Sequence, residues 1–289
     1  MATIAVIGAG QMGSGIAQTA AQYGYKVLLN DVDKAIAEKA IGGIGKQVAR
    51  LVSREKLTAD EGEALIARIT PIGDYAPMGE ADLIIEAATE REEIKLKIIE
   101  TAGKVLGSDA IMASNTSSIP ITRMGAHAVD PKRFIGMHFF NPVPVMGLLE
   151  IIPGLATAAE TTARARAFAE SIGKEVVIAG DDPGFVVNRI LCPMINEAIF
   201  VLGNGMGSIE DIDKGCRIGL NHPMGPLELG DFVGLDTLFE IIKVLYSTTG
   251  DSKYRPAPLL VKYVEAGWIG RKSGRGFYDY SGDVPVPTR

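Results

Sequence analysis

Short apolar runs alternate with amphipathic stretches along the first 184 residues of the chain. The runs consist largely of Val, Ile, Leu and Ala, and Gly or polar residues bound them, so they predict buried strands. These strands should cover 3–7, 26–30, 82–87, 110–114, 133–139, 148–152 and 175–178. Helical patterns fill the intervals at 11–23, 33–53, 59–68, 91–105 and 161–172. Alternation at this spacing predicts an α/β fold with a parallel sheet and right-handed crossovers.

The pattern changes after the segment Asp181-Asp182-Pro183-Gly184. From Phe185 onward it predicts no strand, only helices at 185–202, 208–218, 226–248 and 257–266. The first of these is apolar on nearly all sides, which predicts burial in a domain core or in a subunit interface. We therefore expect an α/β domain over 1–184 and an all-helical domain over 185–289.

Composition and charge narrow the class of protein. Of the 289 residues, 47% are hydrophobic and 22% are charged, as in ordinary globular proteins. The net charge of −6 argues against general nucleic-acid binding, because no basic field attracts phosphates. No apolar segment reaches the roughly 18 residues that span a bilayer, and a first strand starting by Thr3 leaves no room for a signal peptide. We expect a cytoplasmic protein with neither a membrane nor a nucleic-acid partner.

The two cysteines, Cys192 and Cys216, are too few to cross-link a chain of this length. They also lack the neighbouring ligands that a zinc site requires, so no metal is expected. Free cysteine is among the most buried residue types, and both are predicted to be buried thiols in a reducing compartment.

A glycine-rich turn, Gly8-Ala9-Gly10-Gln11-Met12-Gly13, follows the first predicted strand and opens a helix. Asp31 follows Gly8 by 23 residues, at the end of the second strand. In this context the pattern is the fingerprint of a Rossmann-type dinucleotide site. Gly8 permits the tight turn, Gly10 lets backbone approach the pyrophosphate, and Gly13 lets helix and strand pack closely. Asp31 would bind ribose hydroxyls and repel a 2′-phosphate, which favours NAD over NADP, while FAD is an alternative that uses the same fingerprint.

Three histidines are candidates for a general base. The sequence around His127 predicts a surface loop, and the sequence around His222 predicts a structural role for that histidine. His138 differs, because it and Glu150 each stand six residues from Pro144, so a chain reversal there would place them opposite one another. Leucines and isoleucines flank Glu150, which predicts a buried carboxylate that fixes the imidazole tautomer and stabilises the imidazolium. From spacing alone, a structural core histidine fits equally well.

Six segments spread over the whole chain match a known set of motifs. They are 8–15 (GAGQMGSG), 113–118 (ASNTSS), 136–146 (GMHFFNPVPVM), 183–190 (PGFVVNRI), 222–230 (HPMGPLELG) and 267–280. Together they resemble the L-3-hydroxyacyl-CoA dehydrogenase family, and within it the bacterial members that act on 3-hydroxybutyryl-CoA. The resemblance implies a Rossmann-type NAD-binding domain over 1–184 and an all-helical domain over 185–289 for dimerisation and substrate binding.

The resemblance also implies roles for single residues. His138 and Glu150 match the catalytic dyad of the family, and Ser117 and Asn188 match its substrate-binding serine and asparagine. By pattern alone, Ser117 would instead be a helix cap, and Asn188 a polar residue that bonds backbone. Cofactor contacts fall on the glycine turn, on Asp31 and on residues near the nicotinamide half of NAD: Gly8, Gly10, Gln11, Met12, Gly13, Asp31, Glu90, Lys95, Asn115 and Lys272.

The implied reaction interconverts (S)-3-hydroxyacyl-CoA and 3-ketoacyl-CoA with NAD(H), in short-chain fatty acid and butanoate metabolism. His138 would accept the proton of the C3 hydroxyl as hydride leaves C3, while Ser117 and Asn188 position the reacting oxygen or the thioester carbonyl. The residues do not reveal the acyl chain length, and the resemblance favours 3-hydroxybutyryl-CoA and acetoacetyl-CoA.

Coenzyme A requires cationic partners for its phosphates. Lys46, Arg50 and Arg54 recur every four residues on one predicted helix and share a face, and Lys56 follows. Such a stripe is often only a solvated surface. The resemblance implies CoA contacts in this helix–loop region, so Arg50, Arg54 and Lys56 are candidates.

Two other interpretations are open. A sugar-acid dehydrogenase of the L-gulonate type shares the histidine motif, and activity with acetoacetyl-CoA against L-gulonate would distinguish it. A non-catalytic, crystallin-like relative would keep the fold without turnover. The apolar helix from Phe185 predicts a homodimer through the C-terminal half.

Overall fold

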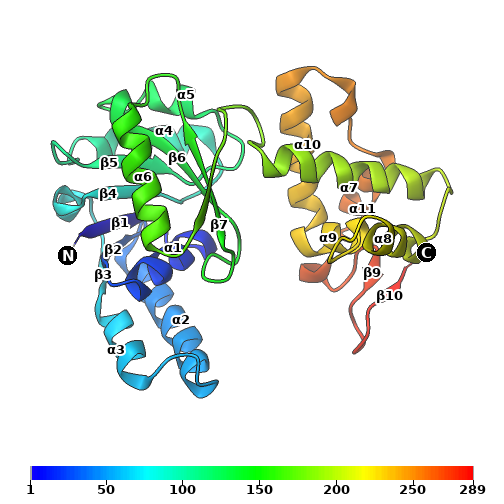
Figure 1. The fold of residues 1–289 in the computed structure, drawn as a ribbon, viewed down its shortest axis with the longest axis horizontal. Coiled ribbons are helices and arrows are strands. Elements are labelled where there is room, and N and C mark those ends of the chain that lie inside the picture. Colours follow the sequence, from blue (N-terminus) through cyan, green and yellow to red (C-terminus); the bar gives the residue numbers. More distant parts are fainter. Residues whose placement is uncertain (1, 289) are drawn as a thin grey trace. The chain divides into compact units, whose positions relative to one another are not determined.

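The computed structural model describes residues 2–288, which divide into two compact units (Figure 1). The first unit ends at Phe185 and the second begins at Val186. The composition change at 181–184 lies just before this division.

The N-terminal unit is built on one eight-stranded sheet with the order β3-β2-β1-β4-β5-β6-β7-β8. The first six strands in this order are parallel, while β7 pairs antiparallel with β6 and parallel with β8. Strand order reverses between β1 and β4, which is the switch point where α/β sheets bind ligands beyond the carboxyl ends of their strands. The strands are β1 (Thr3–Ile7), β2 (Lys26–Asn30), β3 (Ile69–Ile72), β4 (Leu83–Glu86), β5 (Ile111–Ser114), β6 (Phe134–Phe139), β7 (Leu148–Pro153) and β8 (Glu175–Ile178).

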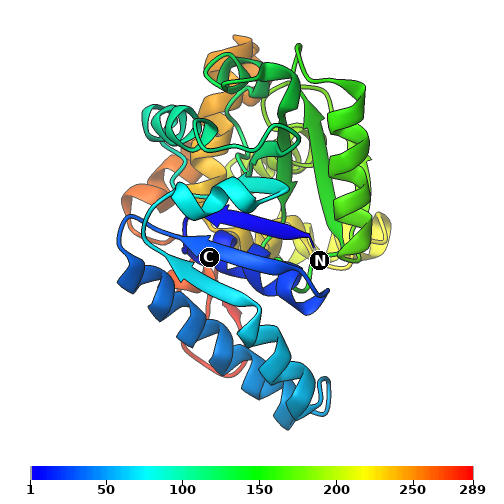
Figure 2. The same cartoon turned by 90° about the vertical axis from the view of Figure 1, so that its left-hand side faces the viewer.

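Helices cover both faces of this sheet, so the unit has three layers (Figure 2). Residues of α1, α2, α3 and α6 share one apolar core with one face of the sheet, and residues of α4 and α5 share a second core with the other. The helices are α1 (Gln11–Gln22), α2 (Lys34–Ser53), α3 (Ala59–Ala67), α4 (Glu92–Gly103), α5 (Ile121–Gly125) and α6 (Ala159–Ser171). The predicted α/β class is confirmed.

The C-terminal unit packs its helices around α7, whose Cys192, Ile195 and Ile199 are buried. The helices are α7 (Val187–Gly203), α8 (Ile209–Gly219), α9 (Pro226–Val233), α10 (Leu235–Thr249) and α11 (Pro258–Glu265). Two buried carboxylates join them to the C-terminal segment. Asp213 accepts from the Leu227 amide at the start of α9 and from the Tyr278 hydroxyl, and Asp231 accepts from the amides of 277 and 278.

Several local predictions were wrong. The strand β3 was missed because Pro71 interrupts its pattern, and an edge strand tolerates proline. The single helix predicted over 226–248 is two helices, because Gly234 adopts φ +98° between them. The helical unit also contains a short antiparallel pair of strands, β9 (Tyr278–Asp279) and β10 (Val286–Pro287), where no strand was expected. Cys192 is buried as predicted, whereas Cys216 is only partly buried.

Candidate active site and cofactor site

The glycine turn lies between β1 and α1, and its geometry explains the spacing of its glycines. Gly8 adopts φ +100°, and a Cβ there would stand 2.6 Å from the Ala87 carbonyl oxygen of the neighbouring β4 loop. A Cβ on Gly13 would overlap the carbonyl oxygen of Gly8. At Gly10, by contrast, an added Cβ would meet no atom within 4 Å. Two glycines of the turn are therefore required by packing within the protein, and the third faces open space.

That open space fits an anionic ligand. Gly10 is the N-cap of α1, and among the described residues no side chain caps this helix and no acidic residue lies in its first turn. The amides of the first turn, including those of Gln11, Met12 and Gly13, are thus available at the positive end of the helix dipole. A pyrophosphate is the ligand that such a turn accepts.

Asp31 stands beside the turn at the end of β2. Its two carboxylate oxygens accept from the amides of Ala9 and Val32, each at 2.7 Å. These bonds hold the carboxylate at the carboxyl edge of the sheet, and each oxygen keeps a second lone pair for a hydroxyl donor.

A buried ionic cluster lies on the other side of the turn, at the end of β4. The Glu86 carboxylate is 0% exposed and the Lys95 side chain 1%, and the Lys95 ammonium donates to both Glu86 oxygens at 2.8 and 3.0 Å. Glu86 also accepts from the Ala88 amide and from the Ser114 hydroxyl at the end of β5. The second carboxylate, Glu90, lies 3.5 Å from Lys95 and is partly exposed.

Glu90 anchors the loop that follows β5. Its carboxylate accepts from the Thr116 hydroxyl at 2.7 Å and from the Ser117 amide at 2.8 Å, and the Ser117 hydroxyl lies at 3.2 Å. Burial alone would raise the pKa of Glu90, but the Lys95 ammonium and these hydrogen bonds together hold that pKa below its usual value. Asn115, in the same loop, accepts from the Phe139 amide at 2.8 Å and so ties the loop to β6.

His138 and Glu150 face each other across the antiparallel pair β6–β7, in the register that their equal distance from Pro144 predicted. The His138 Nδ1 lies 2.8 Å from a Glu150 oxygen, and both side chains are buried. A carboxylate only accepts, so Nδ1 is the donor in this hydrogen bond and Nε2 is left for another partner. The rings of Phe140 and Phe185 pack around the imidazole, at centroid distances of 4.6 and 5.6 Å. The pair is therefore a buried imidazole whose Nδ1 is held by a carboxylate.

The loop between these two strands is fixed from two sides. The Lys174 ammonium donates to the carbonyl oxygens of Val143 and Met146 at 2.6 and 2.7 Å. Val143 packs against α1 at Gly15, where an added Cβ would lie 2.9 Å from the valine Cβ. Burial lowers the pKa of the Lys174 ammonium. The sequence did not predict a functional role for this lysine. Its contacts position the His138–Glu150 hairpin relative to the helix that begins at the glycine turn.

Comparison with known proteins places this geometry in a family. The sequence-family model of the 3-hydroxyacyl-CoA dehydrogenase NAD-binding domain matches residues 3–182. The family model of the 3-hydroxyacyl-CoA dehydrogenase C-terminal domain matches residues 184–280. The chain belongs to the 3-hydroxyacyl-CoA dehydrogenase family. As a member of it, the chain is an NAD-dependent dehydrogenase, and the FAD alternative is set aside.

Individual relatives of this dehydrogenase match over nearly their whole length. The chain is 51% identical over 286 residues to a 3-hydroxybutyryl-CoA dehydrogenase of Bradyrhizobium diazoefficiens, covering 99% of this chain and 98% of that one. It is 52% identical over 277 residues to a probable 3-hydroxybutyryl-CoA dehydrogenase of Bacillus subtilis, covering 96% of each. The crystal structure of (S)-3-hydroxybutyryl-CoA dehydrogenase from Ralstonia eutropha superimposes with a TM-score of 0.93 at 48% identity, covering 97% of this chain and 99% of that one.

The dehydrogenase brings most of its predicted site residues together at one edge of the sheet. These residues lie at or just beyond the carboxyl ends of β1, β2, β4, β5 and β6, or opposite them on β7. They are the residues of the glycine turn, Asp31, Glu90, Lys95, Asn115, Ser117, His138 and Glu150. Asn188 and Lys272 belong to the C-terminal unit. Asn188 is buried in the first turn of α7, and the Lys272 ammonium binds the Asp236 carboxylate at 2.7 Å.

The predicted CoA-binding cations are not part of this edge. Arg50, Arg54 and Lys56 are exposed at the outer end of the α2–α3 hairpin, which projects from the sheet (Figures 1 and 2). None of the three forms an ion pair with any residue between 2 and 288. Their charged groups are therefore free to pair with an anionic ligand. Their positions alone do not show where such a ligand would bind.

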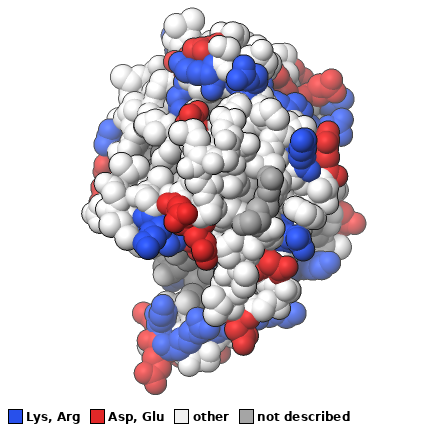
Figure 3. All heavy atoms as spheres, turned by 90° about the vertical axis from the view of Figure 1, so that its right-hand side faces the viewer, with Lys and Arg blue, Asp and Glu red and all other residues white. Residues whose placement is uncertain are grey.

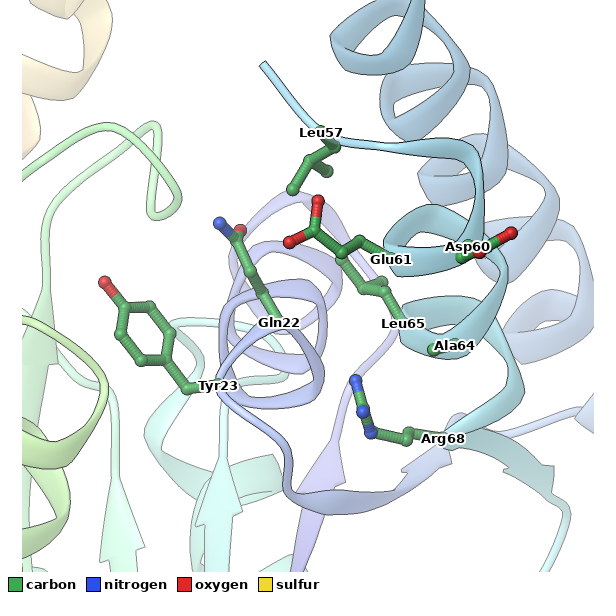
Figure 4. A pocket seen from close by; sticks show the side chains of 8 residues that line it. All are labelled: Gln22, Tyr23, Leu57, Asp60, Glu61, Ala64, Leu65 and Arg68. Carbon is green, nitrogen blue, oxygen red and sulfur yellow. The ribbon is translucent and has the colours of Figure 1, made fainter. Parts of the chain in front are cut away.

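A hollow of about 570 Å³ lies between the end of α1 and α3, where Gln22 and Glu61 reach toward one another (Figure 4). The C-terminal end of α1 is at the amino edge of the parallel strands, opposite the edge that carries His138. This hollow is therefore separate from the His138–Glu150 pair. Its lining consists of Gln22, Tyr23, Leu57, Asp60, Glu61, Ala64, Leu65 and Arg68.

Proposed function

We propose that this chain interconverts (S)-3-hydroxybutyryl-CoA and acetoacetyl-CoA with NAD(H), as an enzyme of short-chain fatty acid and butanoate metabolism. The observation that carries the proposal is the buried His138–Glu150 pair, at the same sheet edge as an open glycine turn. The four-carbon substrate is supported by the names of the relatives at 51% and 52% identity.

In this reaction NAD(H) supplies the acceptor or donor of hydride. His138 acts through Nε2, which accepts the proton of the C3 hydroxyl in oxidation and returns it to the C3 oxygen in reduction. Glu150 stabilises the imidazolium formed in between, because its carboxylate stays hydrogen-bonded to Nδ1. Phe140 and Phe185 pack against the imidazole, and this apolar contact lowers the local dielectric constant and strengthens the charge pairing.

Ser117 is proposed to hold the substrate oxygen. Its amide and hydroxyl both face Glu90, so the position of Ser117 depends on the same carboxylate that contacts Lys95. Asn188 is assigned a matching role on the resemblance of the segment 183–190 alone. The remaining cofactor contacts are proposed for Gly8, Gly10, Gln11, Met12, Gly13, Asp31, Glu90, Lys95, Asn115 and Lys272.

Coenzyme A is proposed to bind Arg50, Arg54 and Lys56 through its phosphates. Reversing both arginine charges, Arg50→Glu with Arg54→Glu, should raise the KM for acetoacetyl-CoA by about tenfold, because exposed pairs contribute about 0–1 kcal/mol each and reversal adds repulsion. The kcat should stay unchanged, and added salt should reduce the difference. Initial rates at low and high salt measure both quantities. Lys97→Glu, an exposed reversal on α4, is the control, and an unchanged KM in the double variant would remove these residues from the CoA site.

A homodimer through the C-terminal unit is also proposed. Large apolar side chains on this unit are exposed, including Ile190 at 66%, Ile218 at 74% and Leu220 at 62%. Figure 3 shows that uncharged residues cover much of the middle of one face. Sedimentation equilibrium should give twice the chain mass of 30.6 kDa, and a mass of one chain at micromolar concentration would contradict the proposal.

The cytoplasm is the proposed location. No helix within residues 2–288 is long and apolar enough to cross a membrane. Both cysteines are free, as a reducing compartment would keep them.

Initial rates with a chain-length series of 3-ketoacyl-CoAs, each with NADH and NADPH, test the proposed substrate. We expect the highest kcat/KM for acetoacetyl-CoA with NADH. A maximum at a longer acyl chain would replace the four-carbon assignment. Turnover of L-gulonate with NAD, without turnover of acyl-CoA, would favour the sugar-acid alternative, and no turnover of either would favour a non-catalytic relative.

A further inference from the structure

The buried Glu86 carboxylate was not predicted as a functional residue, and the proposed mechanism assigns it no task. It is fully buried, yet it is surrounded by donors: the Ala88 amide, the Ser114 hydroxyl and the Lys95 ammonium on both oxygens. A protonated carboxyl would offer a donor of its own in this shell, whereas a carboxylate accepts all four bonds. Glu86 is therefore charged.

The cluster of Glu86, Lys95 and Glu90 then carries two negative charges and one positive charge. Lys95 contacts both carboxylates, at 2.8 Å for Glu86 and 3.5 Å for Glu90, so it neutralises only one of them. Hydrogen bonds from Thr116 and Ser117 keep Glu90 ionised. The cluster thus has a net charge of −1, carried by the buried Glu86–Lys95 pair together with the partly exposed Glu90 carboxylate.

The sheet topology places this charge on the nicotinamide side of the cofactor site. Glu86 pairs in register with Ile7, directly before the glycine turn, and β4 lies on one side of β1 while β2 lies on the other. A dinucleotide whose pyrophosphate meets the turn and whose adenosine ribose meets Asp31 on β2 must extend its other half over β4 and β5. That half carries the nicotinamide, which is cationic in NAD⁺ and uncharged in NADH.

We propose that the net negative charge of the Glu86–Lys95–Glu90 cluster sets the relative affinity of the enzyme for NAD⁺ and NADH, with Glu86 as the buried residue that determines it. The inference rests on the NAD(H) site of the proposed function. Without Glu86, Lys95 and Glu90 would leave the cluster neutral, so Glu86 supplies the net negative charge that attracts the cationic ring. Its effect falls on the oxidised cofactor and leaves the uncharged ring of NADH largely unaffected.

The test is equilibrium binding of both cofactors to the purified protein, by NADH fluorescence titration and by calorimetry for NAD⁺. Glu86→Gln brings the cluster charge to zero and should raise the Kd for NAD⁺ relative to the Kd for NADH by about tenfold, a size typical of coupling between adjacent sites. Glu90→Gln gives the same charge from a partly exposed position and should shift the ratio in the same direction.

A double variant separates charge from structure. Glu86→Gln with Lys95→Met loses the buried ion pair but returns the cluster to a charge of −1, so the Kd ratio should return toward that of the parent protein. Glu100→Gln removes one exposed carboxylate of α4 elsewhere on the surface and should leave the ratio unchanged.

Each result bears on the inference. An unchanged Kd ratio in Glu90→Gln, or in a folded Glu86→Gln, overturns it, as does a double variant that shifts the ratio like the single one. If Glu86→Gln does not fold, the Kd ratios of Glu90→Gln and of the double variant, each compared with that of the parent protein, still test the inference. Failure of the parent protein to bind either cofactor would instead contradict the proposed NAD(H) site itself.

Discussion

Replacing His138 with Gln lowers the kcat for acetoacetyl-CoA reduction by about 10²–10⁴-fold, the usual contribution of general acid–base catalysis. Glutamine keeps a polar group of similar size opposite Glu150 but cannot exchange the proton that the C3 oxygen gains or loses. The KM for acetoacetyl-CoA should change little, because His138 acts on the transition state rather than on ground-state binding. Steady-state rates of NADH oxidation measure both constants.

The controls for this prediction come from the same chain. His127→Gln alters an exposed histidine that pairs with Glu100, and its kcat should match that of the parent protein. Glu150→Gln should also lower kcat, since the carboxylate that stabilises the imidazolium is lost. Near-normal turnover in a folded His138→Gln protein would show that another group transfers the proton.

The second large effect is expected at the glycine turn. Gly13→Ala should lower the free energy of unfolding by about 1–3 kcal/mol, the typical cost of overpacking, because the added methyl overlaps the Gly8 backbone. The turn must then open, and the Kd for NADH should rise by about 10–100-fold if a similar energy is lost on binding. Thermal unfolding and NADH fluorescence titration give the two values.

Gly10→Ala is the matched control, because a methyl group there meets no protein atom within 4 Å and its backbone lies in an ordinary region, at φ −69°. It should leave stability unchanged and weaken NADH binding, since the methyl enters the space assigned to the pyrophosphate. Equal loss of stability in the two variants, or tight NADH binding by Gly10→Ala, would contradict this account of the turn.

Residues whose position depends on local geometry were predictable from the sequence. Pairing of His138 with Glu150 follows from their equal distance from Pro144, because register in a hairpin is fixed by its turn. The glycine turn and Asp31 are likewise close in space because both end adjacent parallel strands. Strong periodicity in the long helices and apolar strands gave most element boundaries to within a few residues.

Features that depend on tertiary context were not predictable in this way. Glu86 ends the apolar run of β4, and nothing local shows that Lys95 and Ser114 surround it; a charged residue closing a buried strand is the only signal. The contacts of Lys174 lie about 30 residues back along the chain. The break at Gly234 was missed because one glycine in an apolar helical pattern is compatible with a continuous helix.

The most direct test of a dehydrogenase that works through His138 is the absorbance of NADH after acetoacetyl-CoA is added to the purified protein, with His138→Gln measured in parallel. We predict a rapid loss of NADH with the parent protein, none without the acyl-CoA, and a rate at least about 100-fold lower in the variant. No loss of NADH with any 3-ketoacyl-CoA, or equal rates in the two proteins, would contradict this mechanism.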